Sequence, residues 1–236
     1  IEEQVNELFP EYQVARMDWD STRGKRSFDN IIDSFTQGKV QILVGTQMLT
    51  KGLDFKKVAL VGVLNADPLL NFPEFRAHER SFQMLSQVAG RSGRFKEQGQ
   101  VLIQSYTPEH PVLLQVINND YEKLFSTQLR ERKEYQYPPF FRLIRITLKS
   151  KDYHQVDQAS QWLVNALNLS LQGSVLGPVD PTIARVRNLY HKQLLIKFLD
   201  NASRNKIKEI VVSSLKSFEA IGAYRSIRVS IDVDPQ

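Results

Sequence analysis

VQILVGTQMLTKGLDF, residues 40–55, joins an apolar run to a polar loop that contains two glycines. The apolar half predicts a buried β-strand that ends near Val44. In the loop, glycine lets backbone N–H groups approach an anion, and threonine and lysine side chains can bind phosphate oxygens. A polar connector rich in turn residues explains the same loop, so a companion motif is needed to decide.

The chain around this stretch alternates helix and strand. Apolar spacing predicts helices over residues 2–9, 27–38 and 73–90, and strands over residues 12–18, 40–46, 58–66 and 99–106. Such alternation predicts an α/β fold with a parallel sheet covered on both faces. Ligands of these sheets gather at the carboxyl ends of the strands, where the loop after Val44 lies.

The companion motif is QVAGRSGR, residues 87–94, at the end of the predicted helix 73–90. Arginines at a helix C-terminus also favour the helix dipole, which is the plainer explanation of Arg91 and Arg94. An arginine fork, however, pairs with phosphate and can stabilise the transition state of phosphoryl transfer. The sequence has no G-x-x-x-x-G-K-[ST], so we expect ATP to be held by another domain that precedes Ile1.

The C-terminal part predicts a second, smaller domain. Strands over residues 143–148 and 226–233, helices over 153–168 and 204–218, and two strands within 175–199 give the order βαββαβ. We expect a split α+β sandwich with an antiparallel sheet. Its hairpin gathers cations and an aromatic ring, a mixture that binds single-stranded nucleic acid, although a solvated hairpin tip explains these charges too. The residues are Arg185, Arg187, Tyr190, His191 and Lys192.

Charge and composition narrow the class of protein. The 236 residues carry a net charge of +5, and residues 141–236 hold 14 Lys and Arg against 8 Asp and Glu, so the excess is C-terminal. This balance suits a polyanionic partner. There is no cysteine and the four histidines are far apart, so we expect no metal site. No membrane span or leader is evident, which predicts a cytoplasmic protein, and the start at Ile1 predicts a piece of a longer one.

The two motifs and several later ones together carry a family resemblance. ILVGTQMLTKGLDF and FRAHERSFQMLSQVAGRSGR, followed by GQVLIQSYTPEHP, YPPF, VLGPVDPTIARVRNLYHKQLLIK and IDVDP, resemble the bacterial primosomal replication-restart helicases of superfamily 2. The resemblance implies a second RecA-like helicase lobe with motifs IV–VI and exit helices over residues 1–137. It implies an S10-like or ferredoxin-like domain that binds DNA and partners over residues 138–236.

The resemblance also implies cofactors and partners. ATP and Mg²⁺ would be bound mainly by a first lobe that precedes this sequence, and zinc by an upstream module. The expected partners are forked and single-stranded DNA, single-stranded DNA-binding protein and other primosome proteins, with no membrane.

Residue roles follow from the same resemblance. Arg94 is the expected arginine finger, with Arg91 and Gln87 beside it, while Asp54 and Gly52 would couple the loop to the nucleotide. The expected DNA contacts are Gly45, Thr46, Gln47, Lys51, Arg185, Arg187, Tyr190 and Lys192. Arg225 and Arg228 are expected to help dock the acidic tail of single-stranded DNA-binding protein.

The function expected is therefore the C-terminal part of an ATP-dependent 3′-to-5′ DNA helicase that restarts replication at stalled forks. Without the P-loop lobe this chain alone should be inactive. Two alternatives remain open: the second lobe of another superfamily 2 translocase, and a non-catalytic DNA-binding or adaptor module with a RecA-like fold.

Overall fold

A computed structural model describes residues 1–18, 25–46, 58–90 and 99–235, with no side-chain description for residues 25–27. The chain forms two compact units. Unit 1 comprises Ile1–Phe72 and Ala77–Leu124, and unit 2 comprises Pro73–Arg76 and Phe125–Gln236. Within the described part of the chain, no helix is long and apolar enough to cross a membrane.

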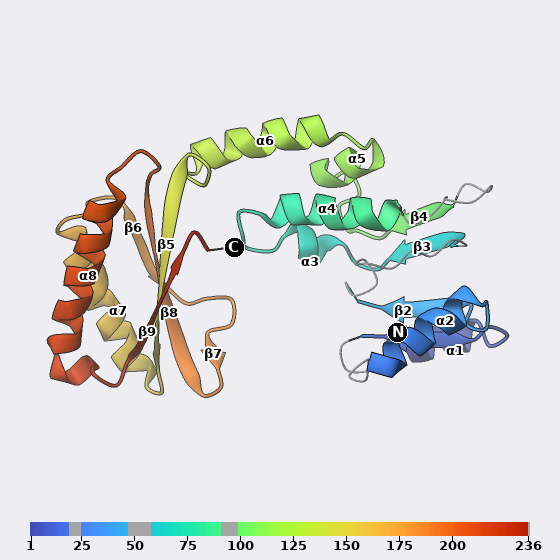
Figure 1. Cartoon of the computed structure of the whole chain (residues 1–236), viewed down its shortest axis with the longest axis horizontal. Coiled ribbons are helices and arrows are strands. Elements are labelled where there is room, and N and C mark those ends of the chain that lie inside the picture. The colour runs from blue at the N-terminus through green and yellow to red at the C-terminus, as the bar shows by residue number, and fades with distance from the viewer. Residues whose placement is uncertain (19–24, 47–57, 91–98, 236) are drawn as a thin grey trace. The chain divides into compact units, whose positions relative to one another are not determined.

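Unit 1 begins with two short strands that pair in parallel. The elements are α1 (Glu2–Leu8), β1 (Val14–Met17), α2 (Lys25–Thr36) and β2 (Ile42–Gly45), and Val14 pairs with Ile42. Both strands run forward with a helix between them, as helix–strand alternation requires. The structure thus confirms the predicted strands and their parallel sense. Figure 1 labels β2 together with α1 and α2.

A second parallel pair follows in unit 1. Its elements are β3 (Leu60–Val63), α3 (Asp67–Leu70), α4 (Ala77–Ala89) and β4 (Gln100–Ile103), with Leu60 opposite Gln100. Among the described residues the four strands form two separate two-stranded sheets, whereas the sequence predicted one sheet. The parallel α/β character is confirmed, and the single continuous sheet is not seen in the described part.

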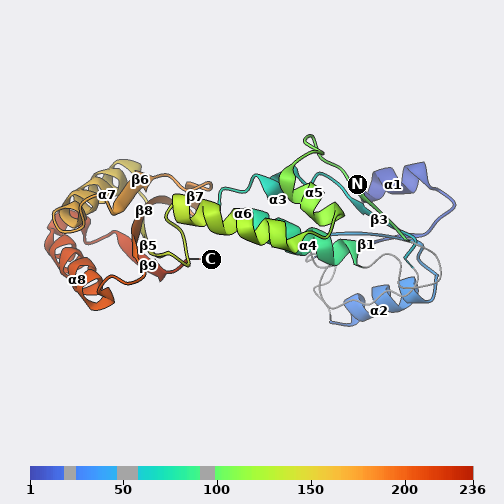
Figure 2. The same ribbon diagram turned by 90° about the horizontal axis from the view of Figure 1, so that it is seen from above.

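Two further helices follow, of which the first lies in unit 1 and the second continues into unit 2 after Leu124. These are α5 (Pro111–Ile117) and α6 (Tyr121–Glu134), and α4 packs against α5 (Figure 2). The core of unit 1 is a cluster of apolar side chains from α3 to α6: Ala66, Leu70, Phe82, Leu85, Val112, Leu113, Val116 and Leu124. Apolar faces of α5 and α6 help to bury α4, and the assignment of these helices as exit helices stays a prediction.

Helix α4 begins at Ala77, four residues later than the predicted start at Pro73. The reason is a contact far away in sequence. The ring of Phe75 stacks on Tyr137 with centroids 4.9 Å apart, and the Arg132 guanidinium lies 5.3 Å from the Phe75 centroid. This packing holds residues 73–76 in unit 2 and delays the helix.

Unit 2 has the predicted βαββαβ order. Its elements are β5 (Phe141–Ser150), α7 (Tyr153–Asn168), β6 (Val175–Val179), β7 (Arg185–Val186), β8 (Leu189–Leu199), α8 (Arg204–Ala220), η2 (Gly222–Tyr224) and β9 (Arg228–Val233). The sheet order is β6-β8-β5-β9, all antiparallel, with the short β7 paired to β8. The predicted antiparallel α+β domain is confirmed.

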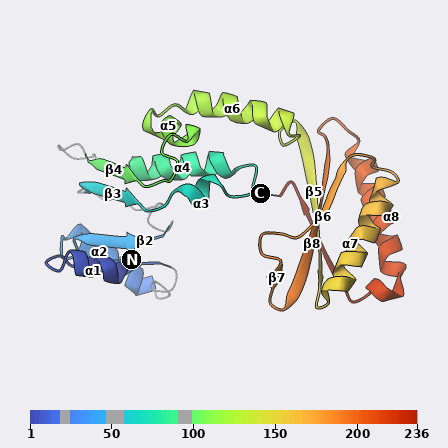
Figure 3. The same ribbon diagram turned by 180° about the vertical axis from the view of Figure 1, so that it is seen from behind.

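Helices α7 and α8 lie on one face of this sheet (Figure 3). Alternate strand residues point toward them, as the period of two in a strand requires. Ile144, Ile146 and Leu148 of β5, and Leu194 and Ile196 of β8, are buried there with Leu163 and Phe218 from the helices. The intervening residues of each strand point to the other face, which we call the open face.

Candidate nucleic-acid interface

The carboxyl end of β2 presents two of the expected DNA contacts. Gly45 is the last residue of β2 and Thr46 follows it, and both are exposed. Their backbone N–H groups and the Thr46 hydroxyl are hydrogen-bond donors of the kind that contact phosphate oxygens. The other expected residues of this loop, Gln47, Lys51, Gly52 and Asp54, lie outside the described residues.

Gln87 lies in the last turn of α4 and is exposed. On the same helix Ser81, Phe82 and Leu85 are buried, so Gln87 faces away from the core of unit 1. Helix α4 thus presents Gln87, the first residue of the QVAGRSGR motif, on the side away from the core of unit 1. Arg91 and Arg94, the expected finger and its neighbour, lie outside the described residues.

A tight hairpin presents the basic residues of unit 2. Strands β7 and β8 pair Arg185 with Tyr190 and Val186 with Leu189, leaving Arg187 and Asn188 as a two-residue loop. Both loop residues have positive φ, 49° and 62°, as a type I′ turn requires. Arg185 and Arg187 are exposed at this turn, where a ligand can reach both.

Within the hairpin Arg185 and Tyr190 form one recognition element. The Arg185 guanidinium carbon lies 4.9 Å from the centroid of the Tyr190 ring, and Nη2 donates to the Asn188 side-chain oxygen over 3.4 Å. The Tyr190 ring also meets Tyr153 edge-on at 5.6 Å. A cation held over a ring at an exposed turn suits phosphate and base contacts together.

Lys192 does not fit the expected phosphate contact. Its side chain is only 7% exposed, and Nζ lies 2.9 Å from Asp157 and 3.1 Å from Asp180, with the Tyr153 hydroxyl at 3.2 Å. Burial alone would lower the pKa of Lys192, but hydrogen bonds to Asp157, Tyr153 and Asp180 outweigh it and raise that pKa. Asp157 and Asp180 therefore neutralise the ammonium within unit 2. Lys192 is buried because it lies on the inward side of β8, with Leu194 and Ile196.

Arg225 and Arg228 are both exposed. Arg225 follows η2, and Arg228 is the first residue of β9, with the buried Ile227 between them. The intervening buried residue anchors this segment, so the two guanidiniums are presented from a fixed backbone. The role of Arg225 and Arg228 in docking the acidic tail of single-stranded DNA-binding protein stays a prediction.

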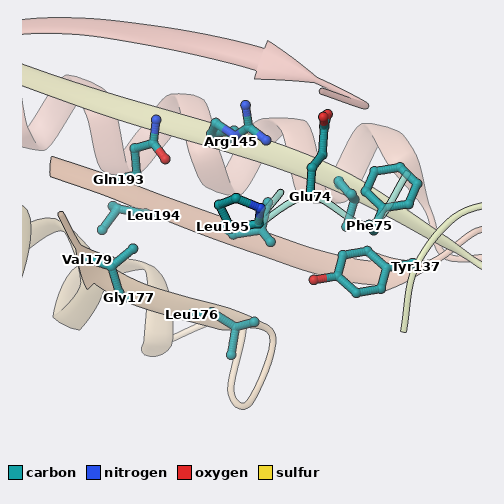
Figure 4. Close-up of a pocket in the computed structure, with 12 residues that line it drawn as sticks. Glu74, Phe75, Tyr137, Arg145, Leu176, Gly177, Val179, Gln193, Leu194 and Leu195 are labelled. Carbon is teal, nitrogen blue, oxygen red and sulfur yellow. The ribbon is translucent and has the colours of Figure 1, made fainter. Parts of the chain in front are cut away.

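Unit 2 also contains a shallow pocket of about 240 Å³ that the sequence did not predict (Figure 4). Phe75 and Tyr137 form one wall, Arg145 and Gln193 lie along the sheet, and Leu176, Gly177 and Leu195 complete it. A side chain at Gly177 would place its Cβ 2.7 Å from the Gln193 carbonyl oxygen. Gly177 therefore keeps β6 close to β8.

The aromatic wall of the pocket is already used. Tyr137 has Phe75 stacked at 4.9 Å and the Lys197 ammonium 3.7 Å from its centroid, so its ring already contacts two groups. Lys197 also donates to the Tyr135 carbonyl oxygen over 2.8 Å. These contacts join Tyr137 to Phe75 and to Lys197, so the stack braces unit 2. No local pattern in the sequence predicts that residues 73–76 pack against the YPPF segment, as Phe75 does on Tyr137.

The described residues contain no group of three or more His, Asp or Glu side chains that could hold a metal ion. The geometry of the described residues therefore gives no support for a metal site among them.

Comparison with known proteins assigns both parts of the chain. Residues 1–96 match the "Helicase conserved C-terminal domain" and residues 133–236 the "Primosomal protein N C-terminal domain". Over its whole length the chain is 34% identical to "Replication restart protein PriA" of Bacillus subtilis, 39% to that of Synechocystis and 38% to that of Treponema pallidum. It spans 29%, 28% and 35% of those relatives, about a third of their length.

Parallel strands followed by an antiparallel α+β sandwich, in the order of these two matches, define the C-terminal lobe of a helicase joined to a primosomal C-terminal domain. The chain belongs to the PriA replication restart family, of which it carries the C-terminal portion.

Proposed function

We propose that this chain is the C-terminal part of an ATP-dependent 3′-to-5′ superfamily 2 DNA helicase that assembles the primosome at stalled forks. The observation that carries the proposal is similarity over the entire chain to replication restart proteins, with both domains matched in order. We place the second RecA-like lobe in residues 1–137 and the DNA- and partner-binding domain in residues 138–236. A bacterial cytoplasmic location at replication forks fits this function.

ATP and Mg²⁺ would be held mainly by a first lobe outside this sequence, and zinc by an upstream module. Bound ATP supplies the phosphoryl transfer that drives movement along the strand. From this chain, Arg91 and Arg94 would approach the γ-phosphate, with Gln87 beside them. An arginine that stabilises this transition state contributes a factor of roughly 10³ to 10⁵ in rate.

The loop after β2 would hold the tracking strand. Gly45, Thr46, Gln47 and Lys51 are its proposed phosphate contacts, and Gly52 and Asp54 would link the loop to the nucleotide. The exposed carboxyl end of β2 supports this placement, since ligands of parallel sheets bind there.

The hairpin would add a DNA contact through Arg185, Arg187 and Tyr190. Lys192 takes no direct part in this proposal because it is buried and paired with two carboxylates. Its proposed contribution is to position the hairpin. Arg225 and Arg228 would help dock the acidic tail of single-stranded DNA-binding protein.

The test is Arg94→Ala in the full-length protein that contains this chain. We expect DNA-stimulated ATP hydrolysis to fall by at least about 10³-fold, while fork binding is retained. Arg94→Lys should rescue little, because an ammonium lacks the planar fork. Lys208→Ala, which removes an exposed charge on α8, is the matched control and should leave hydrolysis unchanged. Equal hydrolysis in Arg94→Ala and the control would refute the arginine finger.

A further inference from the structure

Three basic side chains form a row across the open face of the unit 2 sheet. Lys149 of β5 pairs with His191 of β8 on one side and with Arg228 of β9 on the other. We call these three residues the cationic row. Neighbouring strands lie about 4.8 Å apart, so the row spans three strands within about 10 Å.

The direction of these side chains follows from the core. Leu148 and Val229, which pair with each other across β5 and β9, pack in the core beneath α7 and α8. Lys149 and Arg228 are their immediate neighbours in sequence and so point to the opposite face. His191 likewise alternates with the buried Lys192 along β8.

The cationic row has no negative partner among the described residues. None of the described carboxylates lies within 4 Å of a Lys149 or Arg228 nitrogen, in contrast to Arg142 and Arg204, which pair with aspartates. The acid on the same face of β9, Asp232, is four residues from Arg228, about 13 Å along the strand, and pairs across with Arg145.

Like charges placed opposite each other on a sheet destabilise it. The effect is visible at His191, whose pKa is lowered by burial and further by the Lys149 charge. His191 is therefore mainly neutral at pH 7, and the row still holds two permanent cations beside an imidazole that can donate a hydrogen bond. An anion seated on the row would relieve the repulsion.

The rest of the open face continues this pattern. The next row along β5 is neutral and polar, with Thr147 between Gln193 and Ser230. Arg145 follows in the row beyond, at the edge of the pocket (Figure 4). The open face thus carries hydroxyl and amide groups beside the cationic row, whereas Arg145, about 13 Å along β5, stands opposite Asp232.

We propose that the open face binds the phosphate backbone of single-stranded nucleic acid, with phosphates on Lys149 and Arg228. Cations beside neutral donors match phosphates beside neutral sugars. This inference rests on the proposed DNA-binding function and adds a surface distinct from the hairpin. It adds a DNA contact to the partner-docking role proposed above for Arg228. Tyr190, over which Arg185 lies, packs on the helix side of the sheet, whereas the cationic row is on the other side.

The experiment measures binding of a fluorescein-labelled 15-residue oligothymidylate to the 236-residue chain by anisotropy between 50 and 200 mM KCl. The variant is K149Q/R228Q, and the matched control is K208Q/K216Q, which removes two exposed charges from α8. For K149Q/R228Q we expect at least about tenfold weaker binding at 50 mM KCl. The slope of log K against log[KCl] should become shallower by about 1.4, since each single-strand phosphate contact contributes about 0.7.

The control should retain the wild-type slope. Equal losses in the two double variants would show a general charge effect and overturn the proposal, as would the absence of binding by the wild-type chain at 50 mM KCl. An aspartate-rich peptide of equal charge is titrated in parallel. If the peptide binds through the cationic row and the oligonucleotide does not, the surface is a peptide site and the proposal is wrong.

R185Q/R187Q in the same assay separates the two DNA surfaces. If only R185Q/R187Q loses oligonucleotide binding, the hairpin binds DNA and the proposal for the cationic row is refuted. If K149Q/R228Q loses binding, the cationic row binds DNA, whether or not the hairpin does as well. The helicase proposal is judged independently, by ATP hydrolysis of Arg94→Ala in the full-length protein.

Discussion

The two units differ in how they use their strands. Each described strand of unit 1 has four residues, and the strands pair two by two, whereas β5 and β8 of unit 2 have 10 and 11 residues and pair along nearly their whole length. The long strands of unit 2 bury a continuous core beneath two helices. The short strands of unit 1 instead bring strand ends such as Gly45 to an exposed edge.

The units also bury different titratable groups. In unit 1 the neutral imidazole of His110 caps α5, and its pKa is lowered. In unit 2 the charged ammonium of Lys192 is buried with two carboxylates, and its pKa is raised. Unit 1 should therefore lose stability toward acid and unit 2 toward alkali.

The largest expected effect is on the unit 2 core. Phe218 is 1% exposed and stacks on Tyr224 with centroids 5.1 Å apart, beside Trp162 at 5.9 Å. Phe218→Ala should cost about 3–5 kcal/mol, because it removes this burial and leaves a cavity. Hydrogen exchange followed by mass spectrometry should show the loss of protection in β5, β8 and α7.

The unit 1 core shares no residue with the unit 2 core. Peptides from β3 and α4 should therefore keep their protection in Phe218→Ala, and the matched change Leu85→Ala should do the reverse. If Phe218→Ala removes protection equally from both units, the chain unfolds as one cooperative body and the comparison between units fails.

A smaller effect is expected from Lys192→Met. Removing the cation leaves Asp157 and Asp180 unpaired, but their side chains are 50% and 43% exposed and can be rehydrated by water. We expect a loss of about 1.5–3 kcal/mol in the free energy of unfolding, the range for hydrogen bonds to charged groups. Chemical denaturation at pH 7 measures it, with Lys208→Met as the control.

The pH dependence of this variant checks the cause. A raised pKa in the fold means that the contribution of Lys192 is complete below the ordinary lysine pKa of 10.5 and is lost as the pH rises beyond it. The gap in stability between the wild-type chain and Lys192→Met should therefore narrow above pH 10.5. A gap that stays constant would mean that Lys192 contributes packing and not charge.

The sequence predicted unit 2 better than the details of unit 1, for a physical reason. Strands of ten residues repeat the period-two pattern often enough to be unambiguous, as Ile144, Ile146 and Leu148 illustrate. The start of α4 could not be predicted, because it depends on stacking between Phe75 and Tyr137, which are far apart in sequence. Local patterns carry no information on such contacts.

Among the site residues, the exposed hairpin was predictable and the burial of Lys192 was missed. The signal was present: Lys192, Leu194, Ile196 and Phe198 alternate along β8, so the pattern already placed Lys192 on the core side. Lys192 was nevertheless expected to contact DNA, because a lysine is charged and usually exposed. The cationic row was missed for a different reason, since it depends on the pairing of three strands that the sequence does not specify.

The smallest expected effect concerns His110 and the acid side of the comparison. Its Nδ1 accepts a hydrogen bond from the Val112 N–H over 3.2 Å at the start of α5. Burial lowers the pKa of His110, the nearby His78 lowers it further, and Asp67 opposes them. Because the fold prefers the neutral ring, stability present above the ordinary pKa of 6.5 is lost as the pH falls below it.

His110→Asn separates titration from capping, since asparagine caps helices well and has no proton to gain. At pH 7.5 the variant and the wild-type chain should be equally stable in α5, judged by hydrogen exchange of residues 112–117. Near pH 5 the wild-type chain should be weaker there by about 0.5 kcal/mol, the low end of what a helix cap contributes. A wild-type α5 that keeps its full protection at pH 5 would show that the cap survives protonation, and acid sensitivity would then not distinguish unit 1 from unit 2.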